Sequence, residues 1–362
     1  MLRRTFLQST SAASAALAAQ APGEGIRLGF DSYSIRAFKW KAIQLLDYAA
    51  GLKLDTVQLS SLDDYESLDP AYLARVKEHA KQVGVSIDAG TGCICPSSQS
   101  YNRQRQGEAE EYVVKSLQVA HALGSRVMRC FMGSQADRRG FQSIEAHMEN
   151  TIKVLRAVRS RALDMGIKIA VENHAGDMQA REVKTIIEEA GKDFVASCLD
   201  TGNPMWVVED PFVTLETLAP YVVTTHIRDS AVFEHRRGAA AQWVALGDGS
   251  VDFPKFVEQY RRLCPQASMQ LEIITGRPPD VLPYLEPEFW KYFPKTPASE
   301  FSRFVALAKN GRPYMGPMVI ATNGKQPPVI EAALREQQRV DLERSFEYAK
   351  KTLGVGVRWK AA

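Results

Sequence analysis

Short apolar runs alternate with segments of helical periodicity about eight times along this chain. Parallel strands joined by right-handed helical crossovers produce such an alternation. About eight units over roughly 250 residues favour a closed (β/α)8 TIM barrel. An open doubly wound sheet would usually carry a glycine-rich turn after its first strand, and Phe30–Ser34 is not such a turn. The predicted strands are Ile26–Phe30, Thr56–Leu59, Val85–Asp88, Arg126–Phe131, Lys168–Glu172, Phe194–Leu199, Val222–His226 and Met269–Ile273.

Helices are expected between these strands. Apolar residues recur at helical spacing in Lys41–Leu54, Glu108–Leu123 and Met148–Met165. Gly124 and Gly166 follow the last two segments as C-terminal stops, and Asp252 is a plausible N-cap of a later helix. Ala231–Ser250 is interpreted as a loop between the seventh and eighth units. The predicted barrel therefore covers residues 25–276.

Residues 277–362 are expected to form a separate C-terminal extension. Gly276–Pro317 holds many of the chain's 18 prolines together with a cluster of aromatic residues. Prolines stiffen such a segment and aromatic side chains give it surface to bury. We expect an ordered extension that packs on the barrel or on a partner subunit of a homo-oligomer, closed by a terminal helix at Arg339–Leu353.

The first 21 residues carry the pattern of an export signal. Arg3 and Arg4 precede a weakly apolar Ala/Ser run, and Ala19-Gln20-Ala21 is a small-x-small cleavage pattern. The segment resembles a twin-arginine signal peptide, which implies a periplasmic protein.

Composition limits the classes of partner and of covalent cross-link. Lys and Arg number 45 against 42 Asp and Glu, so the charge balance offers no case for a nucleic-acid or membrane-surface partner. We find no apolar stretch long enough for a spanning helix. The five cysteines are odd in number and scattered, and we interpret them as small buried side chains.

Four chemically reactive residues end four successive predicted strands: Glu172, Asp200, His226 and Glu272. Active groups of a TIM barrel lie at these strand ends, so the four side chains should meet at one point. Three carboxylates would repel one another there unless they share a divalent cation. Carboxylates with an imidazole suit Mn²⁺, Mg²⁺, Co²⁺ or Zn²⁺. We expect one such ion, with Mn²⁺ first.

The motifs around these residues resemble a known family. They are ENHAGD at Glu172–Asp177, LDTGNP at Leu199–Pro204, THIRD at Thr225–Asp229, LGDGSVDFP at Leu246–Pro254 and LEI at Leu271–Ile273. This ordered set is similar to the xylose isomerase-like TIM-barrel superfamily, and more narrowly to its sugar phosphate isomerase/epimerase branch. The resemblance implies that the quartet binds one divalent metal. It also implies that Glu172 and Glu272 exchange protons with a carbon next to the carbonyl of a carbohydrate substrate.

The sequence departs from ketohexose epimerases of this family at two positions, which hold Asn203 where histidine is frequent and Val232 where arginine is frequent. These departures leave the metal quartet intact and leave the substrate open. Arg138 is a weaker substrate candidate, and Tyr33, Trp206 and Trp243 are either a sugar platform or plain packing. The main substrate-binding candidates are His174, Asn203, Arg228 and Arg129.

The leading functional hypothesis is a metal-dependent sugar or keto-sugar isomerase or epimerase that works through an enediolate. The alternative is a metal-dependent lyase or deglycosidase on 3-keto-glycosides, which shares the first proton abstraction. An AP endonuclease would need additional strand-end histidines for a three-zinc cluster, and the predicted strands two and three end in Leu59-Ser60 and Asp88-Ala89 instead. A non-catalytic carbohydrate-binding barrel is disfavoured by the intact quartet.

Overall fold

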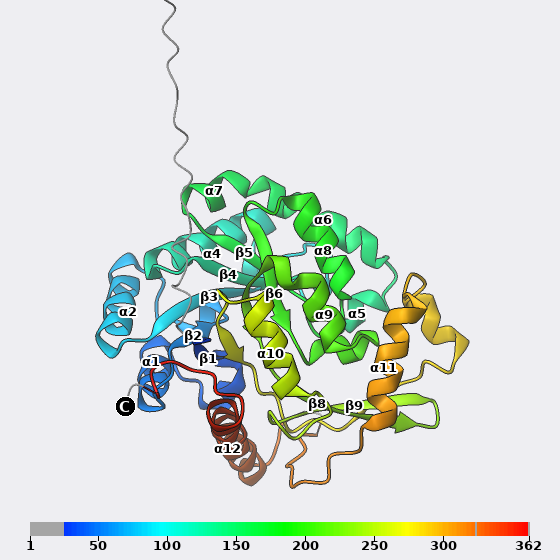
Figure 1. The fold of residues 1–362 in the computed structure, drawn as a ribbon. Coiled ribbons are helices and arrows are strands. Elements are labelled where there is room, and N and C mark those ends of the chain that lie inside the picture. Colours follow the sequence, from blue (N-terminus) through cyan, green and yellow to red (C-terminus); the bar gives the residue numbers. More distant parts are fainter. Residues whose placement is uncertain (1–24, 323, 361–362) are drawn as a thin grey trace, which may run out of the picture.

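The protein folds as a closed barrel of eight parallel strands in the computed structural model, which describes residues 25–322 and 324–360 (Figure 1). The strand order is β10-β1-β2-β3-β4-β5-β6-β7. A parallel bridge between Ile227 and Leu271 joins the two ends of this order, so the predicted (β/α)8 barrel is confirmed. The strands are β1 (Leu28–Asp31), β2 (Thr56–Leu59), β3 (Ser86–Cys93), β4 (Val127–Phe131), β5 (Lys168–Glu172), β6 (Val195–Asp200), β7 (Val222–His226) and β10 (Met269–Leu271).

Helices surround the barrel between successive strands (Figure 1). Gly124 ends α4 in the left-handed conformation at φ 76°, and Asp252 caps α10 by accepting from the Lys255 amide. The segment predicted as one helix at Met148–Met165 is two helices, because Val158 leaves helical geometry at φ −98° and ψ 3°. The main helices are α1 (Ala42–Gly51), α2 (Pro70–Val83), α4 (Ala109–Leu123), α6 (Ile144–Ala157), α7 (Arg159–Asp164), α8 (Ala180–Ala190), α9 (Pro211–Leu218) and α10 (Phe253–Leu263).

Short helical turns occupy several of the connecting loops at the strand ends. They are η1 (Ser32–Phe38), η2 (Leu62–Asp64), α3 (Arg103–Gln106), α5 (Gln135–Arg138), η3 (Asn203–Val207) and η4 (Ala219–Tyr221).

A polar layer fills the barrel interior below the strand ends. Gln270 Nε2 donates to Thr56 Oγ1 and to Asp88 Oδ2, each at 3.0 Å. Gly29 makes room for this layer, because a Cβ there would lie 2.2 Å from the Thr56 carbonyl oxygen and 2.4 Å from Gln270 Oε1. Neighbouring inward side chains therefore hold one another in fixed positions directly under the site.

An antiparallel hairpin follows β7, formed by β8 (Asp229–His235) and β9 (Gly238–Val244). The interpretation of Ala231–Ser250 as a loop is therefore wrong for its first part. Every residue of β9 and the first four residues of β8 are buried, Val232 and Trp243 among them. A third strand, β11 (Asp280–Leu282), pairs with β9 and brings the start of the extension to this hairpin.

The remaining extension packs along the barrel (Figure 1). It contains η5 (Pro287–Tyr292), α11 (Ala298–Asn310), which packs on β8, and α12 (Pro328–Lys351), which packs on η1 and β10. Helix α12 begins well before the predicted start at Arg339, because a proline is accommodated in the first turn of a helix. Gln338 of α12 accepts a hydrogen bond from the Ala37 amide at 3.0 Å, which ties the helix to the loop after β1.

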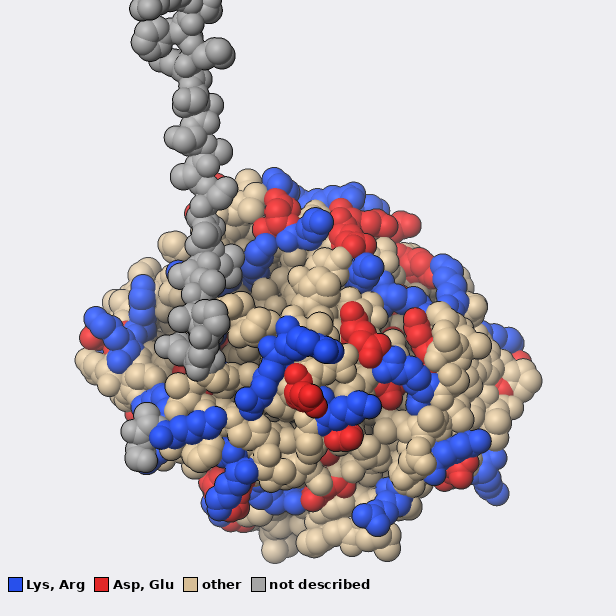
Figure 2. Space-filling model, in the orientation of Figure 1, with Lys and Arg blue, Asp and Glu red and all other residues tan. Residues whose placement is uncertain are grey.

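The predicted signal at residues 1–21 lies outside the described residues. Within the described part of the chain, no helix combines the length and apolarity that a membrane crossing requires. Basic and acidic side chains are interspersed over the face shown in Figure 2. The five cysteines, all of which fall in the described part, are free and buried, as predicted.

Candidate active site

The four predicted metal ligands come together at the C-terminal ends of the strands. Glu172 ends β5, Asp200 ends β6, His226 ends β7 and Glu272 directly follows β10. All four are buried, and one ligand atom from each lies within 4.8 Å of the others. Parallel register produces this convergence, since Asp200 is paired directly with His226 on the next strand.

The donor atoms of this quartet fit a metal ion. Nδ1 of His226 lies 3.2 Å from Glu172 Oε2 and 3.4 Å from Glu272 Oε2. Among the described residues, His226 Nδ1 is buried without a hydrogen-bond partner, and the buried Glu272 Oε2 meets only the guanidinium of Arg228, whose Nη2 lies 2.8 Å away. Buried polar atoms are normally satisfied, so the unpartnered Nδ1 of His226 beside two carboxylate oxygens fits a bound cation. Three carboxylates and one imidazole are the donor set of a hard or borderline divalent ion.

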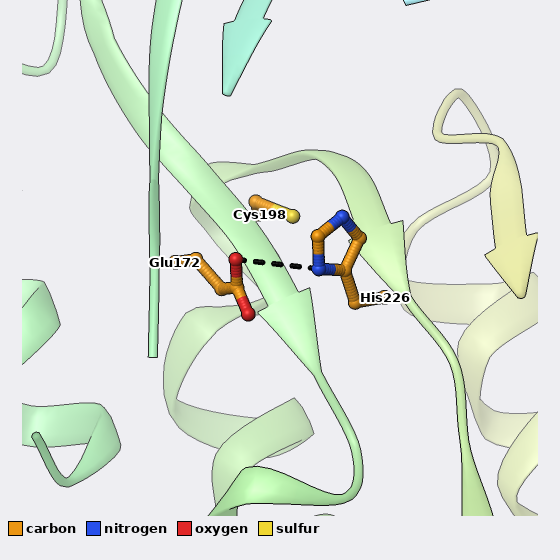
Figure 3. Close-up of side chains that lie close together, drawn as sticks. All are labelled: Glu172, Cys198 and His226. Atoms are coloured by element: carbon orange, nitrogen blue, oxygen red, sulfur yellow. Dashed lines mark ion pairs between the residues drawn. The ribbon is translucent and has the colours of Figure 1, made fainter. Parts of the chain in front are cut away.

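Cys198 lies beside two members of the quartet (Figure 3). Its sulfur, Glu172 and His226 also come close enough to form a three-residue cluster. However, burial raises the pKa of the Cys198 thiol well above its ordinary value. Because metals bind the thiolate, Cys198 is a poorer ligand here than Asp200 or Glu272.

The second ring nitrogen of His226 is held by strands β1 and β2. Nε2 is hydrogen-bonded to Gln58 Oε1 and lies 3.3 Å from Asp31 Oδ2. Gln58 is oriented in turn, since its Nε2 donates to Thr224 Oγ1 at 3.0 Å. A histidine that donates from Nε2 presents the lone pair of Nδ1, so these partners select the tautomer that can bind a metal.

Two of the predicted substrate-binding arginines are ion-paired with the quartet. Arg129 Nε donates to Glu172 Oε2 at 2.6 Å, and Arg228 Nη2 lies 2.8 Å from Glu272 Oε2 and pairs with Asp200 as well. Burial alone would raise the pKa of Glu172, but Arg129 and His226 hold it well below its usual range. Burial would also raise the pKa of Glu272, but the neighbouring Arg228 and His226 outweigh this effect and lower the pKa to about 2.

His174 and Asn203, the other two predicted substrate-binding residues, both line a cavity above the quartet. His174 stacks on Phe131 with ring centroids 3.8 Å apart, and its Nδ1 is 2.6 Å from the Gly133 carbonyl oxygen. Asn203 Nδ2 donates to Glu172 Oε1 at 3.2 Å, while its buried Oδ1 is unsatisfied among the described residues. Both side chains therefore touch the site and keep polar capacity for a ligand.

Two other polar residues near the strand ends, Asp229 and Arg138, stabilise loops. Asp229 accepts from the amides of Gly247 and Gly249 at 3.1 and 3.0 Å, which fixes the LGDGS turn. Arg138 donates to the carbonyl oxygens of Asp177 and Tyr292, so it serves the packing of the extension. Neither Asp229 nor Arg138 lines the cavity.

A cavity of about 660 Å³ opens above the quartet. Glu272, Arg129 and Arg228 form part of its wall, together with Tyr33 and Trp243. Trp206 does not line the cavity and instead supports Trp243 from behind, with ring centroids 4.3 Å apart. The site thus combines a polar metal-binding floor with aromatic walls, which is the make-up of a small-molecule pocket.

Residues 46–284 match the model of the family described as xylose isomerase-like TIM barrel. The chain belongs to this family. A similar curated protein is the 3-oxo-isoapionate decarboxylase of Pectobacterium atrosepticum, 24% identical over 243 residues that cover 62% of this chain and 78% of the relative.

Two solved structures share the fold of this xylose isomerase-like chain. A D-psicose 3-epimerase crystallised in the presence of D-fructose superposes with a TM-score of 0.58 at 16% identity, over 91% of this chain and 100% of that one. The IOLI protein with a bound zinc atom gives a TM-score of 0.51 at 15% identity, over 78% and 95% of the two chains. The family resemblance drawn from the motifs is confirmed.

Sequence reasoning about the xylose isomerase-like site missed Gln58 and Asp31. Asp31 is the last residue of β1 and Gln58 the last but one of β2, and the two residues are paired in register. Both residues could have been recognised as candidates from the sequence, because a polar side chain that points inward near the end of a barrel strand is a candidate site residue. Only the cross-barrel contact with His226 shows what they do.

Proposed function

We propose that the protein is a divalent-metal-dependent isomerase or epimerase of a sugar or keto-sugar. The observation that carries this proposal is the position of two carboxylates, Glu172 and Glu272, within 3.4 Å of the same unsatisfied nitrogen of His226. A centre with two ionised carboxylates beside a cation site is suited to proton transfer next to a carbonyl group.

Glu172, Asp200, His226 and Glu272 would hold the ion. When bound, a divalent cation supplies positive charge beside the substrate oxygens and stabilises the enediolate. Mn²⁺ is our first choice, and Mg²⁺, Co²⁺ and Zn²⁺ suit the same donors.

The two glutamates have distinct places in the mechanism. Glu272 lines the cavity and is 5% exposed, so it is the carboxylate that meets the substrate first. Arg228 keeps it ionised against the effect of burial, so that it can accept a proton from the carbon next to the carbonyl. Glu172 lies deeper and would return a proton, which inverts the carbon or moves the carbonyl.

The surrounding residues would orient the sugar. His174, Asn203 and Arg228 present polar groups to the cavity, and Tyr33 and Trp243 add aromatic surface to its wall. Arg129 lines the same wall and holds Glu172 in place through its ion pair. The sugar substrates in the names of the similar proteins support this class of ligand.

The second candidate is a metal-dependent lyase or deglycosidase that acts on 3-keto-glycosides. The relative named as a decarboxylase supports it, because loss of carbon dioxide also breaks a bond beside a carbonyl carbon. The cavity of about 660 Å³ lies within the range of ~300–1,000 Å³ that is typical of small-molecule pockets, which leaves room for a leaving group beside one sugar ring.

One experiment separates these functions. The full chain, loaded with Mn²⁺, is incubated in deuterium oxide with free ketoses and with 3-keto-glycosides. An isomerase or epimerase incorporates deuterium and forms a sugar isomer, whereas a lyase releases an aglycone or other fragment. Absence of both exchange and product with every sugar would count against the proposal.

We also propose export to the periplasm, supported by Arg3-Arg4 and the Ala19-Gln20-Ala21 pattern. Twin-arginine export carries folded proteins, which suits a chain that acquires its metal before export.

A further inference from the structure

The charges at the floor of the cavity are balanced once a divalent ion is bound. The acidic groups are Glu172, Asp200, Glu272 and the buried Asp31, and the basic groups are Arg129 and Arg228. Together with one divalent cation, the two guanidinium groups match the four carboxylates. Arg129 and Arg228 are therefore committed to the metal ligands and leave no surplus positive charge for a substrate anion.

The rim of the cavity is different, because it carries unbalanced positive charge. Arg277 lines the cavity five residues after Glu272, and its guanidinium lies over the Trp243 ring, 5.5 Å from the centroid. Arg36 stacks on Tyr33, which lines the same cavity, at 4.4 Å. Within residues 25–322 and 324–360, no carboxylate forms an ion pair with either arginine. By contrast, Arg105 on another part of the wall is paired with Asp63.

Arg36 and Arg277 repel each other. Burial is the largest cause that lowers the pKa of Arg36, and the nearby charge of Arg277 lowers it further. An anion beside these two guanidinium groups would reduce the repulsion between them.

The backbone of Arg277 is fixed, while its charged end is free to bind. The Arg277 carbonyl oxygen accepts from Gln242 Nε2 of β9 at 2.8 Å, and the Gly276 carbonyl oxygen accepts from the Ala321 amide at 2.9 Å. The hairpin and the C-terminal extension thus anchor the residue at the rim. The exposed guanidinium, which has no carboxylate partner among the described residues, can therefore meet a planar anion at the rim.

We infer that Arg277 binds a carboxylate group of the substrate, so that the enzyme acts on an acidic sugar rather than a neutral one. This inference rests on the proposed function, because it concerns the ligand of the same cavity. A guanidinium meets a carboxylate through two parallel hydrogen bonds, and its single charge matches that of the carboxylate. The carboxylate at the rim and the reacting carbon over Glu272 would set the orientation of the sugar in the cavity.

Binding measurements test the inference without requiring turnover. Calorimetric titrations of the full chain, loaded with Mn²⁺, compare D-gluconate with D-sorbitol, a neutral polyol of the same carbon number, and with sorbitol 6-phosphate. We expect gluconate to bind about 10- to 100-fold more tightly than sorbitol, because this is the gain in affinity that a charge-assisted hydrogen bond contributes. Arg277→Gln should remove that preference, and Arg277→Lys should retain part of it.

Lys115→Gln is the matched control, since Lys115 is another cation of the cavity wall. It should keep the preference for gluconate. Equal binding of gluconate and sorbitol, an unchanged preference in Arg277→Gln, or an equal loss in Lys115→Gln would each overturn the inference. Tighter, Arg277-dependent binding of sorbitol 6-phosphate would overturn the assignment to a carboxylate. Arg277-dependent gluconate binding without proton exchange on any sugar would instead refute the proposed function and leave the anion site standing.

Discussion

Gln58 accepts a hydrogen bond from Nε2 of His226 across the barrel, from strand β2 to strand β7. The contact directs the other nitrogen of His226 toward Glu172 and Glu272. Gln58→Leu should therefore weaken metal binding by about 10- to 100-fold, the usual effect of losing such a partner of a ligating histidine. Titration of the metal-free protein with Mn²⁺ measures this change.

The control for Gln58→Leu is Gln82→Leu, on the exposed face of α2. It should bind Mn²⁺ as the wild type does. If Gln58→Leu binds Mn²⁺ with wild-type affinity while its fold is intact, then Gln58 does not set the tautomer of His226.

Gly29 is required by the packing of the barrel interior. An added Cβ would lie 2.2 Å from the Thr56 carbonyl oxygen, so Gly29→Ala should lower the free energy of unfolding by about 1–3 kcal/mol or more. Gly51→Ala is the matched control, because a Cβ at that helical position meets nothing within 4 Å. It should leave stability unchanged or raise it by up to about 1 kcal/mol. Equal denaturation midpoints for the two variants would contradict this account of the interior.

Glu209 should make stability depend on pH. It is 2% exposed and accepts from Thr214 Oγ1 at 2.6 Å, and burial raises its pKa to about 7. The folded state thus keeps a proton that the unfolded chain releases from about pH 4.5 upward, and this contribution to stability is lost as pH rises toward 7. Glu209→Gln, which has no charge to bury, should gain stability relative to the wild type between pH 5 and pH 8.

Denaturant unfolding of both proteins at pH 5 and pH 8 measures this gain, which should be on the order of 1–3 kcal/mol. The exposed Glu66→Gln variant serves as the control and should show no comparable change. A stability difference between Glu209→Gln and the wild type that is the same at both pH values would rule out this role of Glu209.

The leader hypothesis predicts that residues 1–21 are absent from the mature protein. Intact mass and N-terminal sequencing of protein from the native host test this, with cleavage expected after Ala21. Recovery of Met1 in the exported fraction would refute cleavage, and recovery of the protein from the cytoplasm alone would refute export.

Strand-end chemistry was predictable because it depends on local order in the sequence. Glu172, Asp200 and His226 each end a short apolar run, and parallel pairing brings such ends together. The partners of these residues were less predictable. Gln58 and Arg277 act through contacts between distant strands and loops, and the sequence near each does not specify those contacts.

The predicted boundaries of helices and strands were wrong where tertiary packing outweighs the local sequence pattern. The hairpin β8–β9 lies in a segment that contains Gly238 and a run of alanines, residues that do not favour strands. The glycine and the alanines belong to β9, which is a strand nevertheless because it pairs with β8 on one side and with β11 on the other. Similarly, α12 extends back to Pro328, well before the start predicted at Arg339.

The most direct test of the central claim is solvent deuterium exchange by Glu172→Gln and Glu272→Gln at saturating Mn²⁺, with the best sugar substrate of the wild type. Each amide variant keeps the shape of the side chain but loses its base, so turnover should fall by about 10²–10⁴. Retention of the fold is checked by thermal melting, and metal content by elemental analysis. One variant is expected to exchange deuterium without forming product, because the opposite carboxylate remains. Near-normal turnover by either variant with the metal site filled would contradict the account and place the proton transfer on other residues.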